Sequence, residues 1–380
     1  MNLTLHLTNS CNLKCEYCFV DPGMQRMTQD VAFAAINFAM QNCTSSGLLF
    51  YGGEPLLERK LIEGIIEYSG NIRKKTGHAF YYKITTNGTL LDESFINMAK
   101  EANLMFGFSH DGLAQDTCRV FHNGQGSFSV LEEKIPMLLK QHPYSVGMSV
   151  INPSTVHRAA ETVQFLFDKG FRYITQSLNY SRFAPWTQSH FNILKKEYEK
   201  MVNMYLIWTR TEEKFYLSPI DLKIISHIKG ESYAKDRTVY ARNQLSVAPD
   251  GKIYPGSKYI DNPYFEIGDV FSGIDAVKSK AAYEKIEIIP EPCSECTLRP
   301  RCNYVYDSIS SKGDGTVRDV SPVQCAHEQL ITPIADTVAE KLYKERNAMF
   351  MHKHYNKMYS VVSLVEDKGV YLPEIISAYE

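Results

Sequence analysis

The chain has 380 residues, of which 44% are hydrophobic and 22% charged, so it has enough apolar side chain to bury a large core. Its 41 Lys and Arg nearly balance its 43 Asp and Glu, and the formal net charge of -2 gives no reason to expect a nucleic acid partner. The first residues lack a signal-peptide pattern, and no apolar run reaches the ~20 residues of a membrane span. We therefore expect a cytoplasmic protein with no membrane partner.

Short apolar runs alternate with helical segments through the first half of the chain. Six runs are rich in β-branched and aromatic residues and predict strands covered on both faces, at 3–8, 48–51, 81–86, 104–109, 145–151 and 173–178. Helices are expected between them, at 28–42, 58–75, 92–102, 127–141 and 154–170. Repeated strand–helix units indicate parallel pairing, so we predict an α/β fold containing a partial (β/α)6 barrel of TIM type. Ligands of such sheets bind at the carboxyl ends of the strands.

The second half predicts a smaller, cysteine-rich region. Residues 187–229 are helical and rich in aromatics, 245–260 form a hairpin pattern, and 327–346 predict a long closing helix. A further hairpin is expected at 359–375. We divide the chain into a barrel with connecting helices (1–230), a cysteine-rich domain with its closing helix (231–350) and a C-terminal tail (351–380).

Seven of the nine cysteines form two groups, and in a reducing compartment we do not expect disulfides. Cys43 and Cys118 stand alone and are predicted to be buried apolar residues or idle thiols. Cys11, Cys15 and Cys18 follow the first strand with the spacing CxxxCxxC. Thiolates select zinc, copper(I) or iron–sulfur clusters, and a zinc site or a fully ligated four-iron cluster needs four ligands. Three thiols suit a cluster with one iron left open to a small molecule.

The CxxxCxxC stretch, with Tyr17 before its last cysteine and Phe19 after it, resembles the signature of the radical S-adenosylmethionine (SAM) enzymes. The resemblance implies that Cys11, Cys15 and Cys18 hold a 4Fe-4S cluster whose open iron binds SAM. Reductive cleavage of SAM then gives a 5'-deoxyadenosyl radical that removes a substrate hydrogen, with an electron donor such as flavodoxin or ferredoxin as partner. No catalytic residue is assigned beyond the cluster.

Motifs at the ends of the predicted strands support this resemblance. "YGGEP" (51–55) follows the second strand, and its glycines allow backbone to come close to a ligand. By resemblance, Arg119 pairs its guanidinium with the SAM carboxylate. Asp111 is predicted to be a turn former. The residues predicted to contact SAM are Tyr17, Gly52, Gly53, Glu54, Asn87, Ser109, Arg119 and Asn152.

The second cysteine group is Cys293, Cys296, Cys302 and Cys325. By spacing alone these thiols could hold one structural zinc or one 4Fe-4S cluster. Beside a radical SAM core, the spacing resembles the SPASM extension of peptide-modifying enzymes, which implies one auxiliary 4Fe-4S cluster. That extension usually holds two auxiliary clusters, and the ligands of the first are missing here, since Gly256 and Tyr306 stand where it carries cysteines.

The leading hypothesis is a maturase of a ribosomally synthesised precursor peptide, which forms a thioether or carbon-linked crosslink by hydrogen abstraction. Because the first strand starts close to Met1, we expect no leader-recognition domain before it, and a separate leader-recognition protein is a candidate partner. An alternative is oxidation of the anaerobic sulfatase-maturating type or of a small molecule. Ser257 argues against the sulfatase-maturating alternative, because it stands where those enzymes carry a catalytic aspartate. An alternative of another class is a non-catalytic zinc-binding scaffold.

Overall fold

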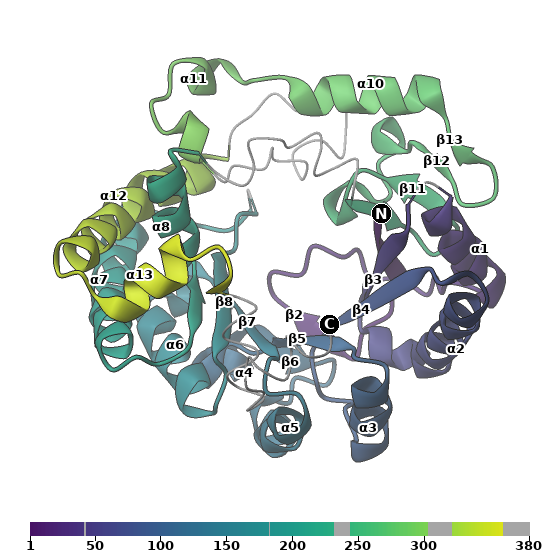
Figure 1. Ribbon diagram of the computed structural model, residues 1–380, viewed down its shortest axis with the longest axis horizontal. Helices are drawn as coiled ribbons and strands as arrows, with labels where there is room; N and C mark the ends of the chain where they lie inside the picture. The colour runs from purple at the N-terminus through teal and green to yellow at the C-terminus, as the bar shows by residue number, and fades with distance from the viewer. Residues whose placement is uncertain (42, 182, 232–243, 303–320, 360–380) are drawn as a thin grey trace, which may run out of the picture.

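A twisted sheet that curls into an open barrel organises the computed structural model (Figure 1). The structure describes residues 1–41, 43–181, 183–231, 244–302 and 321–359. The predicted hairpin at 359–375 and Tyr306 therefore lie outside the described residues, apart from Tyr359. None of the helices in these ranges is both long enough and apolar enough to cross a membrane.

All six predicted strands are present and pair in parallel in the order in which they occur along the chain, which confirms the partial barrel. Their apolar runs are nearly continuous because helices cover the outer face while other side chains fill the inside. The strands are β1 (Asn2–Thr8), β3 (Ser45–Gly52), β4 (Ala79–Thr86), β5 (Met105–Ser109), β7 (Val146–Ile151) and β8 (Tyr173–Leu178).

Short strands extend the sheet at both edges. At one edge β9 (Tyr216–Ser218) pairs in parallel with β8. At the other edge β10 (Gln244–Val247) pairs in parallel with β1, and β11 (Lys252–Tyr254) turns back on it as the predicted hairpin. The antiparallel strands β12 (Gly268–Asp269) and β13 (Gly273–Ile274) complete this edge. The sheet thus continues across position 230, where we place a domain boundary, and that boundary stays a prediction.

Helices between the strands cover the outside of the barrel, as expected (Figure 1). Thr28 and Asp92 cap two of them by accepting hydrogen bonds from the N–H groups of Val31 and Phe95. The helices are α1 (Gln29–Met40), α2 (Arg59–Thr76), α3 (Glu93–Glu101), α4 (Gln115–Cys118), α5 (Phe128–Gln141) and α6 (Ala159–Asp168). A short 3-10 turn, Pro153–Arg158, precedes α6.

A group of helices closes the opposite side of the molecule. The predicted closing helix is α12, and it packs against both α7 and α8. The buried imidazole of His327 on α12 binds the hydroxyl groups of Tyr180 and Tyr198, which anchors this packing. The helices of this group are α7 (Gln188–Arg210), α8 (Ile220–Lys229), α12 (Pro322–Lys344) and α13 (Ala348–Tyr355). Two further helices, α10 (Ala276–Glu287) and α11 (Glu291–Ser294), lie apart from this group, and α10 contacts the 3-10 turn Pro263–Phe265 beside β12 (Figure 1).

Candidate functional site

The loop that carries Cys11, Cys15 and Cys18 is fixed by a second, two-stranded sheet. Its strand β2 (Leu13–Cys15) pairs antiparallel with β6 (Arg119–Phe121), which places Cys15 opposite Arg119. One residue further, the N–H of Glu16 donates to the carbonyl oxygen of Cys118 at 2.9 Å. The first cysteine group is therefore anchored to the segment that follows β5, at the carboxyl end of the barrel strands.

Two glycines, the last residue of β3 and the residue after it, bring the end of this strand against the same loop. A Cβ atom on Gly52, whose φ is +128°, would lie 2.3 Å from the carbonyl oxygen of Thr8, and one on Gly53 would lie 2.1 Å from that of Ser10. The N–H of Gly53 donates to Thr8 at 2.7 Å, and the N–H of Glu54 donates to Ser10 at 2.9 Å. These glycines are required because the backbone of the cysteine loop lies against them. Their predicted contact with SAM stays a prediction.

Glu54 joins the ends of two strands from inside the protein. Its fully buried carboxylate accepts hydrogen bonds from Thr86 Oγ1 at 2.7 Å and from the N–H groups of Asn87 and Leu56 at 2.8 and 3.0 Å. Burial raises the pKa of Glu54 to about 7, although these three bonds act against the rise. Because both carboxylate oxygens bind the protein itself, the predicted SAM contact of Glu54 would use its main chain.

Asn87 lies directly beside the first cysteine. Its side-chain N–H group points at Cys11 Sγ over 3.8 Å and donates to Asn12 Oδ1 at 2.9 Å. Its Oδ1 accepts from Thr89, which holds the amide in this orientation. An N–H donor next to a metal-binding sulfur is the kind of neighbour that tunes an iron–sulfur cluster.

A buried ion pair lies on the other side of the loop. Arg119 Nε donates to Asp111 Oδ2 at 2.9 Å, the Tyr17 hydroxyl donates to the same oxygen, and the guanidinium lies 5.1 Å from the centre of the Tyr17 ring. Asp111 Oδ1 accepts from the N–H of Val150 at 2.9 Å. The prediction that Asp111 is mainly a turn former is therefore incomplete, since its side chain connects β7, Tyr17 and Arg119. Nothing in the Asp-Gly pair signals that role in the sequence.

Asn152 follows β7, and its side-chain amide donates a hydrogen bond to the thiol of Cys118. Its Nδ2 lies 3.1 Å from Cys118 Sγ and 3.3 Å from Glu16 Oε2. Cys118 is buried, as predicted, but it is not idle. Cys43 is half-buried and donates to the carbonyl oxygen of Ala39. The contacts of Asn152 and Ser109, the last residue of β5, with SAM stay predictions.

The thiols of the first group share one electrostatic environment. Burial raises the pKa of Cys11 to about 12, and Glu54, Cys15 and Cys18 act in the same direction. Burial also raises the pKa of Cys15, and the Arg119 guanidinium opposes the rise. Across the described ranges, no three Cys, His, Asp or Glu side chains are drawn together closely enough to hold a metal ion. The donor chemistry of three sulfurs with an amide N–H and a cation beside them nevertheless fits an iron–sulfur cluster.

The second cysteine group is positioned by buried charges between helices. Lys223 on α8 pairs with Glu328 on α12 and donates to the carbonyl oxygen of Arg301 at 3.1 Å. The guanidinium of Arg301 in turn pairs with Asp336 of α12. These contacts fix the segment before Cys302 against the helix whose first turn carries Cys325. Cys293 lies on α11 and Cys296 two residues beyond its end.

Cys296 and Cys325 are close enough to interact. Burial raises the pKa of Cys325, and Cys296 is the next contributor in the same direction. The four thiols come from three segments of the chain, which differs from the single loop of the first group. Their donor set fits either candidate, zinc or iron–sulfur.

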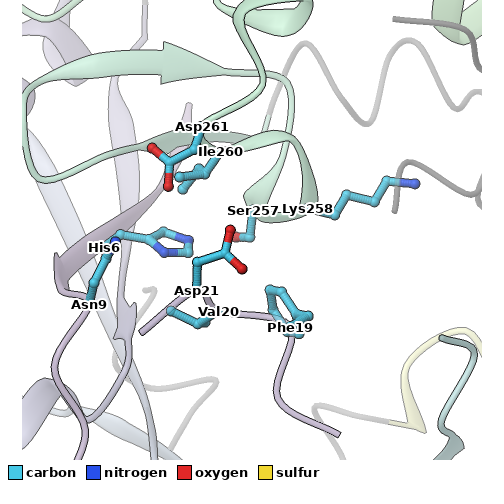
Figure 2. A pocket seen from close by; sticks show the side chains of 9 residues that line it. All are labelled: His6, Asn9, Phe19, Val20, Asp21, Ser257, Lys258, Ile260 and Asp261. Atoms are coloured by element: carbon cyan, nitrogen blue, oxygen red, sulfur yellow. The ribbon is translucent and has the colours of Figure 1, made fainter. Parts of the chain in front are cut away.

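A polar pocket that the sequence did not predict adjoins the first cysteine loop (Figure 2). It lies between β1, the residues that follow Cys18 and the turn that follows β11. Its lining residues are His6, Asn9, Phe19, Val20, Asp21, Ser257, Lys258, Ile260 and Asp261. The alternation of polar and apolar residues in β1 was the available signal for His6, since it places Thr4, His6 and Thr8 on one face.

Comparisons with known proteins agree with this geometry. Residues 5–166 match the family model of the radical SAM superfamily. The chain is 28% identical over 246 residues to an uncharacterized protein of Methanocaldococcus jannaschii, which covers 61% of this chain and 83% of that protein. It is 25% identical over 278 residues to a cysteine-type anaerobic sulfatase-maturating enzyme of Clostridium novyi, with 68% of this chain and 73% of that enzyme covered.

Two solved structures share the fold. Native anSMEcpe with bound AdoMet and Cp18Cys peptide has a TM-score of 0.72 at 20% identity, covering 90% of this chain and 99% of that chain. Streptococcus suis SuiB bound to precursor peptide SuiA has a TM-score of 0.59 at 14% identity, covering 85% of this chain and 75% of that chain. The similarity to both extends beyond the barrel into the cysteine-rich region.

Proposed function

Because residues 5–166 match the family model of the radical SAM superfamily, we propose that this chain matures a ribosomally synthesised precursor peptide by removing hydrogen and closing a thioether or carbon-linked crosslink. The observation that carries the proposal is the convergence of the ends of β1, β3, β4 and β5 on the loop of Cys11, Cys15 and Cys18. Support for a peptide substrate comes from the fold shared with SuiB and anSMEcpe, whose structures contain peptides.

Cys11, Cys15 and Cys18 would hold a 4Fe-4S cluster, and the loop contacts explain how the chain would keep it in place. When bound together, cluster and SAM supply a 5'-deoxyadenosyl radical that removes a hydrogen atom from the substrate. Gly52 and Gly53 hold the loop against β3, Asn87 directs an N–H group at Cys11, and the Asp111 carboxylate fixes Arg119.

The SAM site would lie along the same strand ends. We assign to it Tyr17, Gly52, Gly53, Glu54, Asn87, Ser109, Arg119 and Asn152. Asp111 engages Arg119 through Nε, which orients the guanidinium for a carboxylate partner at its other nitrogens. The guanidinium lies against the Tyr17 ring and the ion pair is buried, which keeps water from these two charges.

The second cysteine group would hold one auxiliary 4Fe-4S cluster through Cys293, Cys296, Cys302 and Cys325, as in a SPASM-like extension. A flavodoxin or ferredoxin would donate electrons, and a separate protein would recognise the leader of the peptide. The match of residues 5–166 to the radical SAM family model favours this enzyme over the zinc-binding scaffold. We retain the cytoplasm as the proposed location.

The proposal is tested with anaerobically purified protein. We expect about eight iron atoms per chain from two 4Fe-4S clusters. Cys15→Ala should abolish formation of 5'-deoxyadenosine while keeping the iron of the auxiliary cluster, and Cys43→Ala, a thiol outside both groups, should change neither. Colourless protein containing zinc, or 5'-deoxyadenosine from the Cys15→Ala variant, would refute the proposal.

Oxidation of the sulfatase-maturating type is the second candidate. It is favoured by the similarity to the Clostridium novyi enzyme and by the pocket around Ser257, which contains the carboxylates of Asp21 and Asp261. The product separates the two candidates, because an aldehyde made by such oxidation reacts with a hydrazine and a crosslink does not. Mass spectrometry of the peptide after hydrazine treatment decides between them.

A further inference from the structure

The pocket beside the first cysteine loop contains a buried polar atom that the protein leaves without a hydrogen bond. His6 is 2% exposed, and its Nε2 has no hydrogen-bond partner among the described residues. A buried nitrogen without a hydrogen bond destabilises the protein, so a ligand that donates a hydrogen bond to it would recover that loss. The same side chain lines the pocket.

The imidazole of His6 is held in a fixed place by its neighbours on the inner face of the barrel. His6 on β1 pairs in register with Tyr51 on β3, and their ring centres lie 5.2 Å apart. Phe19 also stacks on Tyr51, with ring centres 6.0 Å apart. Burial lowers the pKa of His6 to about 3, so its ring is neutral at physiological pH and one nitrogen can accept a hydrogen bond.

Two carboxylates flank this imidazole. Figure 2 shows the ring of His6 pointing between Asp21, which follows the cysteine loop, and Asp261, which follows the turn after β11. The side chain of Lys258 extends away from His6 in the same view, and its Nζ lies 5.0 Å from the centre of the Tyr259 ring. The pocket therefore presents negative charge and hydrogen-bond acceptors around an aromatic wall.

The backbone at Asp261 supports a role for this side chain. Its φ is +64°, in the left-handed region that Asp and Asn tolerate better than other residues with a side chain. Such conformations cost free energy and cluster at functional sites. Here the turn directs the carboxylate of Asp261 toward a strand from the opposite end of the sequence.

We infer that this pocket binds the cationic side chain of a Lys or Arg residue in the peptide substrate, through Asp21, Asp261 and the Nε2 atom of His6. The inference rests on the proposed peptide-modifying function and specifies part of its substrate. An ammonium or guanidinium group carries only donors, which matches two carboxylates and an accepting imidazole. The pocket adjoins Phe19, the residue after Cys18, so a side chain bound there would place its neighbours in the peptide near the first cysteine group.

The test measures binding to the full-length protein by calorimetry, without SAM or reductant. The probes are the amides of Nα-acetyl-lysine, Nα-acetyl-arginine, Nα-acetyl-norleucine and Nα-acetyl-glutamate. We expect saturable binding of the lysine or arginine derivative, or both, and at least tenfold weaker binding of the other two, about the effect of losing a charged hydrogen bond. The relative affinities of the two cationic probes identify which side chain the pocket prefers.

Variants locate the binding. Asp261→Asn keeps a residue that tolerates positive φ and should weaken binding about tenfold or more, as should Asp21→Asn. Asp168→Asn removes the same charge from the exposed end of α6 and should change nothing. In protein labelled with 15N-histidine, the cationic probe should shift the His6 signal, which is assigned by its loss in His6→Gln.

Equal binding of the norleucine probe, no saturable binding of either cationic probe, or affinity unchanged in both aspartate variants would overturn the inference. These outcomes are independent of the proposed function. Formation of 5'-deoxyadenosine with a peptide can persist when the pocket binds no cation, and the pocket can bind a cation in a protein that modifies no peptide.

Discussion

The two cysteine groups are built in different ways. Around Cys11, Cys15 and Cys18 the chain uses backbone: β2 pairs with β6, and glycines let β3 dock on the loop. The second group depends on side chains instead, because the buried Lys223–Glu328 and partly buried Arg301–Asp336 ion pairs hold its segments together. Backbone docking leaves no room for a side chain at the contact and so tolerates little change, whereas ion pairs between helices depend on charged side chains that can be replaced together.

Breaking the buried ion pair should have the largest effect on stability. Lys223→Met leaves Glu328 buried without its cation, so we expect the free energy of unfolding to fall by about 3–5 kcal/mol. The proposed auxiliary cluster should lose iron while the proposed first cluster keeps it. Chemical denaturation and iron analysis measure both effects.

Two further variants control this prediction. Lys280→Met breaks an exposed pair with Glu284 and should change the free energy of unfolding by less than about 1 kcal/mol. Lys223→Met combined with Glu328→Leu should recover much of the lost stability, since no charge is then left buried. An equal loss in both lysine single variants would contradict the role given to Lys223.

Adding a methyl group at Gly53 should damage the first group selectively. A Cβ atom there would lie 2.1 Å from the Ser10 carbonyl oxygen, so Gly53→Ala should move the cysteine loop and lower the free energy of unfolding by about 1–3 kcal/mol. SAM cleavage should be lost and the auxiliary iron kept. Gly64→Ala in α2 is the matched control, because nothing lies within 4 Å of its added Cβ and a helix favours Ala.

The buried carboxyl of Glu54 should make the metal-free protein less stable as the pH rises. Its folded pKa of about 7 lies above the ordinary value of 4.5, so the folded state binds more protons between these values. The free energy of unfolding should therefore fall through this window, by on the order of 1–3 kcal/mol from this group. Denaturation at several pH values should show the fall, and Glu54→Gln should remove it. A fall of the same size in the variant would rule out Glu54 as its source.

The smallest effect is expected at Asn87. Asn87→Ala removes the N–H group beside Cys11 Sγ and should cost about 1 kcal/mol of stability. Loss of a donor to sulfur should also lower the reduction potential of the first cluster without affecting the auxiliary one. A redox titration followed by electron paramagnetic resonance distinguishes the two clusters, and unchanged potentials would show that Asn87 does not tune the first.

The parts of the structure that follow from local patterns were predictable. The six core strands and the helices between them are long apolar or amphipathic segments, and CxxxCxxC places three thiols on one loop. Strands of two or three residues, such as β2, β6 and β9, have too few residues to show a period. They form because tertiary pairing fixes them.

The side-chain roles depend on contacts between distant residues, which a single sequence does not show. The sequence pattern around Asp111 predicts a turn residue. Its contacts with Arg119 and Tyr17 depend on the pairing of β2 with β6. The glycines of "YGGEP" were expected to make room for a ligand, and the structure shows that they make room for the cysteine loop. His6 lines the same pocket as Ser257 and Asp261 because β10 pairs with β1, and this pairing is not visible in a single sequence.

The pairing of β1 with β10 has a consequence for biogenesis. Asn2 and Gln244 are register partners, so one edge of β1 has no native neighbour until translation has passed residue 244. An unsatisfied strand edge can recruit other chains, and pairings between such distant residues form slowly. Nascent chains stalled before residue 244 should therefore aggregate or bind chaperones more readily than chains released with β10 complete.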